Sequence, residues 1–266
     1  MKLKYLSIFF IVFGASSCMW GVPKKQKQAI IKDTLGYSYK IIKKRASDCG
    51  NKPDSECSVV NIKYPVFKEQ QSLNDSIENQ LLTLFLQRDT ANKSLQKLPV
   101  NFISSYENDK KQNTNIEKYT LNIYAAVIRQ DSSLTTLEIG GYAYEGGAHG
   151  ADLTYFINWN SKRGAKILLS DIFVYGYKEP LTKIAEKIFR KDEKLADTAT
   201  LANDYFFEKN KFSLNDNFLI TPLGLRFLYN EYEIKSYAAG TTALFIPYSQ
   251  IKSLLKPHTV VAQYIK

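Results

Sequence analysis

The sequence predicts an α+β fold of two closely packed modules, built mostly of antiparallel sheet with a few helices. Segments rich in β-branched and aromatic residues, with apolar and polar positions alternating, recur along the chain and are typical of half-buried strands. Segments with apolar residues at helical spacing lie apart from them, so the helices are segregated among the strands. That segregation favours α+β over an alternating α/β arrangement.

The first half of the chain contains two strands, two helices and a meander. Residues 37–42 and 58–64 are predicted strands joined by a hydrophilic loop. A helix is predicted from Ser72, because apolar residues then recur at helical spacing at Leu73, Ile77, Leu81, Leu84 and Phe85. Phe102, Ile103 and Tyr106 predict a second, shorter helix, followed by a charged loop over 110–115. Further strands are predicted over 119–129, 134–142 and 153–159.

The second half begins after a hairpin-type turn at 160–164. A third helix is predicted near Pro180, since Leu181, Ile184, Ala185 and Ile188 follow at helical spacing. Strands are expected over 214–220, 225–229 and 242–246, and a short helix over 249–255.

A glycine-rich corner separates two of the predicted strands. It runs from Tyr144 to Gly150 and contains His149, one of two histidines in the chain. Glycine reaches positive φ without steric cost, so Gly146 and Gly147 can turn the chain sharply.

The first eighteen residues predict a lipoprotein signal peptide. Two lysines precede an apolar run that is too short to span a bilayer, and small residues lead to Cys18 in a pattern that resembles a bacterial lipobox. The alternative is ordinary cleavage nearby, with Cys18 a bystander. We expect Cys18 to be lipidated and residues 19–35 to form a polar tether. No acidic residues follow Cys18 directly, which favours an outer-membrane lipoprotein of the bacterial envelope that faces the periplasm.

Cys49 and Cys57 flank the loop between the first two strands. In an exported protein such a pair predicts a disulfide. A metal site with two thiolates would need further ligands, and no histidine lies near in the sequence.

The formal net charge of +10 favours acidic partners such as anionic lipid or polysaccharide. The basic residues are dispersed and the export signal removes the protein from the cytoplasm, so nucleic acid is not an expected partner.

Two groups of residues are candidates for function. His149 and Glu145, with Asp152 nearby, could perform acid–base chemistry. The alternative is that His149 fixes the glycine corner to the sheet. The second group combines Tyr229, Tyr232 and Tyr237 with Glu231 and Glu233 as a possible aromatic and acidic patch. Its alternative is that these tyrosines pack a loop onto the second module.

Enzymatic motifs are missing from the sequence. It contains neither His-Glu-x-x-His nor Gly-x-Ser-x-Gly, and no phosphate-binding or dinucleotide-binding glycine pattern. With two histidines, a zinc hydrolase would need two carboxylate ligands. We therefore expect no metal and no cofactor, and the sequence favours a protein without enzymatic activity.

The corner sequence from Tyr144 to Gly150, the turn at 161–164 and the segment Leu168 to Phe173 resemble RsiV-type envelope proteins. The segments 218–220, 224–229, 231–240 and 245–248 continue that resemblance. It implies a PdaC-like domain over 36–164 and an RsiV-like C-terminal domain over 165–266. Some RsiV-type proteins bind lysozyme through their outer domain.

The leading hypothesis is a lipid-anchored envelope protein that acts as a non-enzymatic binding module for a cell-wall glycan or a lysozyme-like protein. We expect Tyr144, Glu145 and His149 to contribute to binding together with the tyrosine and glutamate patch. The alternative is a glycan-modifying hydrolase that uses His149 and Glu145.

Overall fold

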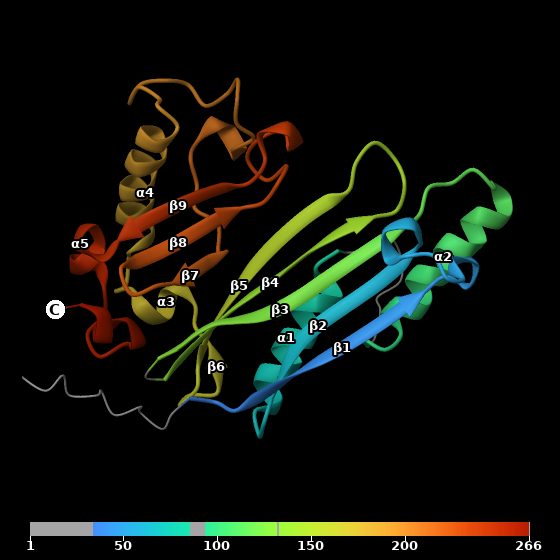
Figure 1. Ribbon diagram of the computed structural model, residues 1–266. Coiled ribbons are helices and arrows are strands. Elements are labelled where there is room, and N and C mark those ends of the chain that lie inside the picture. The colour runs from blue at the N-terminus through green and yellow to red at the C-terminus, as the bar shows by residue number, and fades with distance from the viewer. Residues whose placement is uncertain (1–33, 86–93, 132, 266) are drawn as a thin grey trace, which may run out of the picture. The chain divides into compact units, whose positions relative to one another are not determined.

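The computed structural model describes residues 34–85, 94–131 and 133–265 (Figure 1). The predicted signal peptide, Cys18 and nearly all of the predicted tether lie outside these ranges. Within the described ranges, no helix has the length and apolar character needed to cross a bilayer.

Among the described residues, six strands form one sheet in the order β1-β2-β3-β4-β5-β6. The strands are β1 (Tyr37–Arg45), β2 (Val59–Phe67), β3 (Thr120–Asp131), β4 (Leu134–Tyr144), β5 (Ala151–Asn160) and β6 (Ala165–Lys166). Neighbours are antiparallel except β2 and β3, which run parallel. The five long strands confirm the alternating patterns. The prediction ended the second strand before Pro65, but β2 continues through it. Pairing with β3 stops at Lys63, so on that side the missing N–H of Pro65 removes no ladder bond.

Helices α1 (Gln71–Thr83) and α2 (Leu98–Gln112) form the crossover between the parallel strands and cover one face of the sheet (Figure 1). Leu73, Ile77 and Leu81 are buried against that face, which confirms the predicted helical spacing. The expectation that the second helix is shorter was wrong, because α2 extends to Gln112 into the predicted loop. Its last turns are polar, so apolar periodicity stops at Tyr106 although the backbone remains helical.

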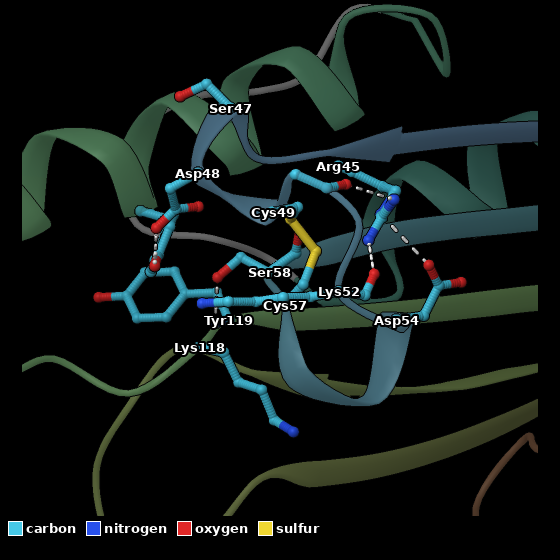
Figure 2. The surroundings of a disulfide bond; sticks show 12 residues. Arg45, Ser47, Asp48, Cys49, Lys52, Asp54, Cys57, Ser58, Lys118 and Tyr119 are labelled. Atoms are coloured by element: carbon cyan, nitrogen blue, oxygen red, sulfur yellow. Dashed lines mark hydrogen bonds and ion pairs between the residues drawn. A yellow bond between two sulfur atoms is a disulfide. The ribbon is translucent and has the colours of Figure 1, made fainter.

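A disulfide joins Cys49 and Cys57 within the connection between β1 and β2 (Figure 2). Both cysteines are buried, and Ser58 beside them accepts a hydrogen bond at Oγ from the backbone N–H of Tyr119 at 2.8 Å. The loop is therefore attached to the start of β3 as well as closed on itself.

The second sheet consists of β7 (Phe218–Ile220), β8 (Gly224–Tyr229) and β9 (Thr242–Pro247), all antiparallel. Helices α3 (Leu169–Ile172), α4 (Lys178–Asp192) and α5 (Tyr248–Ile251) accompany it, and α4 contacts β9 (Figure 1). The third predicted helix is confirmed as α4, with Leu181 and Ala185 in the core. The strand expected over 214–220 is shorter than predicted. Its first part bends locally, because Asn217 donates its backbone N–H to Oδ1 of Asn215 at 3.2 Å.

The outer edge of β5 is bonded by asparagine side chains of the second module rather than by a long strand. Asn217 accepts from the backbone N–H of Phe156 at 3.0 Å and donates to the carbonyl of Thr154 at 2.8 Å. Asn230 accepts from the N–H of Thr154 at 2.8 Å. The side-chain amide of Asn158 on β5 bonds to the second module in turn. It donates to the carbonyl of Phe218 and accepts from the backbone N–H of Ile220. These amides satisfy an edge that would otherwise carry buried unpaired backbone groups.

Candidate functional site

The corner between β4 and β5 takes its shape from two glycines in the left-handed region. Gly146 has φ +86° and Gly147 has φ +95°, which L side chains rarely adopt. The hydroxyl of Tyr144 lies 3.0 Å from the carbonyl oxygen of Gly147 and also donates to the carboxylate of Glu117. That bond to Glu117 is the main reason why the pKa of Tyr144 is raised. Tyr144 thus stabilises the corner from within.

Gly150 allows the corner to close over the sheet. A Cβ at this position would lie 2.3 Å from Cζ of Tyr142, so glycine lets the ring lie where it does, and a larger residue would have to displace it. Gly150 is itself buried. The following residue begins β5, and His149 is therefore held in a fixed place directly before the strand.

His149 is exposed, and both of its ring nitrogens have partners. Nδ1 lies 2.8 Å from the carbonyl oxygen of Gly150, and Nε2 lies 3.2 Å from the hydroxyl of Tyr232. A carbonyl can only accept, so in the neutral imidazole Nδ1 carries the proton and Nε2 accepts from Tyr232. The ring is oriented by these two bonds.

The imidazole also contacts two tyrosine rings, and together they form the His149 cluster, which consists of His149, Tyr232 and Tyr237. The ring of Tyr237 is stacked on that of His149 with centroids 3.8 Å apart and planes inclined by 16°. The ring of Tyr232 lies 6.0 Å from His149 and 5.7 Å from Tyr237. Tyr232 is 57% exposed, so the cluster presents an aromatic surface to solvent.

The loop between β8 and β9 supplies both tyrosines. Its shape depends on Glu233, which accepts from the backbone N–H of Asn230 at 2.8 Å and from the side-chain amide of Asn215 at 2.6 Å. Ile234 next to it is buried. Tyr232 has φ +62°, an uncommon conformation for a bulky residue. Glu233 was expected in the binding patch; in the structure one of its carboxylate oxygens bonds to Asn230 within the loop and the other to Asn215, which precedes β7.

Carboxylates surround the cluster. Glu231 accepts a hydrogen bond from the backbone N–H of Asp152 at 3.4 Å. This bond holds the loop between β8 and β9 against the start of β5. Burial raises the pKa of Tyr237, and the negative charges of Glu231 and Asp152 contribute to that rise. The cluster therefore lies in an acidic setting on a chain whose net charge is +10.

The remaining sequence candidates lie in different places. Tyr229 is 1% exposed and donates its hydroxyl to the carbonyl of Ser213 at 2.8 Å, so its expected place in an exposed patch is wrong. Tyr229 lies on β8 and packs in the hydrophobic core of the second module. Glu145 is exposed. Burial and a hydrogen bond to Asp109 raise the pKa of Tyr119 to about 12, and the charge of Glu145 contributes to that rise.

Tyr142 is a neighbour of the site that was not predicted, whereas Asp152, opposite it, was named as a candidate for acid–base chemistry. They face each other across β4 and β5. Strand alternation puts Tyr142 and Tyr144 on the same face of β4, and that was the available signal for Tyr142. In the described part of the chain, no group of three or more His, Cys, Asp or Glu side chains is arranged to hold a metal ion.

Two family models match separate regions of this chain. Residues 51–152 match the model described as "Deacetylase PdaC", and residues 170–249 match "Protein of unknown function (DUF3298)". Peptidoglycan-N-acetylmuramic acid deacetylase PdaC of Bacillus subtilis strain 168 is 23% identical over 198 residues. The match covers 73% of this chain and 38% of that protein, so the chain spans well under half the length of this relative.

Two solved structures share the fold. A member of the DUF3298 family from Bacteroides fragilis NCTC 9343 has a TM-score of 0.67 and 23% identity, covering 87% of this chain and 98% of that one. A DUF3298 family protein from Pseudomonas aeruginosa PAO1 has a TM-score of 0.65 and 24% identity, covering 85% and 96%.

Proposed function

We propose that the PdaC-like region and the DUF3298 region of this chain together form a non-enzymatic binding module for a cell-wall glycan. The module is held at the bacterial envelope by a lipid on Cys18, at the periplasmic face of the outer membrane. The C-terminal region is RsiV-like in this proposal. The ligand contacts the His149 cluster, to which each region contributes.

The observation that carries the proposal is the stack of His149 on Tyr237, with Tyr232 beside it. Aromatic rings bind the apolar faces of sugars, and their polar edges bind hydroxyl and amide groups. The cluster is oriented before any ligand arrives, since His149 is bonded at both nitrogens. A preformed surface loses little side-chain freedom on binding.

The relative from Bacillus subtilis supports the choice of ligand, because its name states that it acts on N-acetylmuramic acid in peptidoglycan. The net charge of +10 also suits a polymer that carries carboxylates. The surroundings of the cluster are acidic, however, and that observation favours a second candidate, a basic lysozyme-like protein whose cationic surface would contact Glu231.

A glycan-modifying hydrolase with His149 as the base is less well supported. The lone pair that a neutral His149 would use for proton abstraction lies at Nε2, which accepts from Tyr232. Catalysis would first require that bond to break.

Replacing Tyr237 by alanine tests the glycan proposal. The variant should bind purified peptidoglycan about tenfold more weakly in a sedimentation assay, because it removes the ring stacked on His149. The matched control is Tyr175→Ala, which removes a fully exposed tyrosine elsewhere. Unchanged binding by a folded Tyr237→Ala variant would refute the placement of the glycan. Glu231→Lys separates the two candidates, since charge reversal should weaken binding to lysozyme far more than binding to peptidoglycan.

The anchor is tested by Cys18→Ser, which should move the protein from the membrane fraction to the soluble fraction of lysed cells. An unchanged distribution would contradict lipidation.

A further inference from the structure

A second site lies at the opposite end of β5 from the His149 cluster. A cavity of about 510 Å³ is bordered by the turn between β5 and β6, by α3 and by residues 258–263. At the usual rise per residue, the ends of β5 are about 30 Å apart. The two sites share no residue, and a volume of this size accommodates one or two sugar rings.

The turn between β5 and β6 positions two cations beside this cavity. Asn160 accepts at Oδ1 from the backbone N–H groups of Lys162 and Arg163, at 3.1 Å and 3.0 Å. Its carbonyl accepts from Gly164 at 2.9 Å. Lys162 and Arg163 are therefore attached to a turn with a defined shape.

The charge around the cavity is positive. The guanidinium of Arg163 lies 3.3 Å from one oxygen of Asp171, whose other oxygen accepts from the N–H of Leu168 at 2.8 Å. The Arg163 side chain is 56% exposed and keeps donors free for a ligand. Within the described ranges, the side chains of Lys162 and His258 have no hydrogen-bond or ion-pair partner. One carboxylate thus faces two permanent cations and an imidazole.

The floor of the cavity is apolar. Ile167 and Ile172 lie beneath it and are each 1% exposed, and the partly exposed Val260 supplies the apolar surface that a ligand can reach. A ligand that complements such a cavity has an apolar face and a single negative charge. A sugar ring with a carboxylate substituent has both, whereas a phosphate lacks an apolar face and its second charge would be repelled by Asp171.

We infer that this cavity binds a carboxylate-bearing sugar, whose carboxylate pairs with Lys162 and Arg163 and whose ring lies against Val260. The inference rests on the proposed function, because it assigns an acidic sugar of the cell wall to a second site on the same module. The His149 cluster then contacts the glycan through its rings, and the cavity recognises its charge.

Calorimetric titration of the full-length chain tests this inference with N-acetylmuramic acid as the probe. N-acetylglucosamine is the matched control ligand, because it lacks the lactyl carboxylate. We expect the acidic sugar to bind at least about tenfold more tightly than the neutral one, since a charged hydrogen bond contributes about 1.5–3 kcal/mol. The double variant Lys162→Ala/Arg163→Ala should lose this preference, and Lys187→Ala, which removes an exposed lysine on α4, should retain it.

Equal binding of the two sugars would overturn the inference, as would competition by inorganic phosphate as strong as that by N-acetylmuramic acid. Two variants distinguish a failure of this inference from a failure of the proposed function. Tyr237→Ala should leave binding of the single sugar unchanged while it weakens binding to peptidoglycan. The Lys162 and Arg163 variant should abolish the preference for the single acidic sugar even if peptidoglycan binding proves independent of Tyr237.

Discussion

Gly150 shows how one hydrogen atom in place of a side chain determines the shape of the candidate site. The ring of Tyr142 packs where a Cβ would be, and the corner beyond it carries His149. The nearest atoms are at the outer end of the Tyr142 side chain, so a larger residue at 150 would have to push that ring away from the sheet.

Gly150→Ala should therefore destabilise the protein by about 1–3 kcal/mol, as overpacking does in other tightly packed regions. Chemical denaturation measures this loss. Gly36→Ala is the control, because a Cβ there would meet no atom within 4 Å, and it should change the free energy of unfolding little. Adding Tyr142→Ala to Gly150→Ala should recover part of the loss. If it does not, the clash with Tyr142 is not the cause.

The candidate residues could be listed from the sequence, but their grouping could not. Tyr229 and Tyr237 have the same chemistry and lie in one stretch of chain, yet one is in the core and the other is stacked on His149. The position of Tyr229 on β8 decides its burial. The meeting of His149 with Tyr232 joins residues separated by 83 positions, and no local pattern encodes such a contact.

Helix α2 is attached to the cystine loop by a small polar group. Asp48, next to Cys49, accepts from the hydroxyl of Tyr106 at 2.9 Å and pairs with Lys110. The hydrogen bond from Lys110 lowers the pKa of Asp48 below its ordinary value of 3.8, and the bond from Tyr106 acts in the same direction. The aspartate favours the folded state while it is ionised.

This pairing predicts a dependence of stability on pH. Because the pKa of Asp48 is lower in the folded state, its contribution is present above about pH 3.8 and is lost as the pH falls through the folded value. Asp48→Asn should lower the melting temperature at pH 7, and the difference from the unmodified chain should shrink as the pH falls below about 3.8. Asp197→Asn, which changes an exposed carboxylate, is the control. If the melting temperatures of Asp48→Asn and the unmodified chain still differed by the same amount at the lowest pH, this account would be contradicted.

At the scale of elements, period-two alternation located the strands, and apolar spacing located α1 and α4. Both patterns report burial, and α1, α4 and the inner long strands have buried residues, whereas β1 at the edge of the sheet has none. The predicted boundary was wrong where the buried residues end before the helix does, as in α2, whose last turns are polar. The prediction also failed over 214–217, where side-chain amides replace strand pairing.

The two sheets are joined by asparagines, and we expect this link to couple the unfolding of the two sheets. Phe156, Leu219 and Leu228 form a small apolar cluster between the sheets. Next to it, Asn217 is 8% exposed and provides the acceptor for the N–H of Phe156.

Asn217→Ala should lower the free energy of unfolding by about 1–3 kcal/mol, because it leaves a buried N–H without its acceptor. The variant should also separate the unfolding of the two sheets. Fluorescence of Trp159, in the core of the first sheet, and circular dichroism should then give different midpoints in urea. Asn61→Ala removes an amide that pairs with Asn122 on an exposed face, and it should leave the two midpoints coincident. Coincident midpoints in Asn217→Ala would show that the amide does not couple the sheets.

These asparagines were not predicted, because a single asparagine in a sequence is more often a turn residue. Two modules could be inferred from the patterns, but the chemistry that joins them depends on partners 60 and 61 residues away.

The capped edge of β5 has a consequence for how such proteins diverge. Asn217 and Asn230 belong to the second module. Their hydrogen bonds to the first module all involve main-chain groups, at Thr154 and Phe156. Every residue except proline offers those groups, so β5 can exchange its side chain at 154 without losing these bonds, whereas Phe156 also packs in the apolar cluster between the sheets. The second module cannot exchange its amides so freely. Substitutions should therefore accumulate faster at position 154 than at positions 217 and 230.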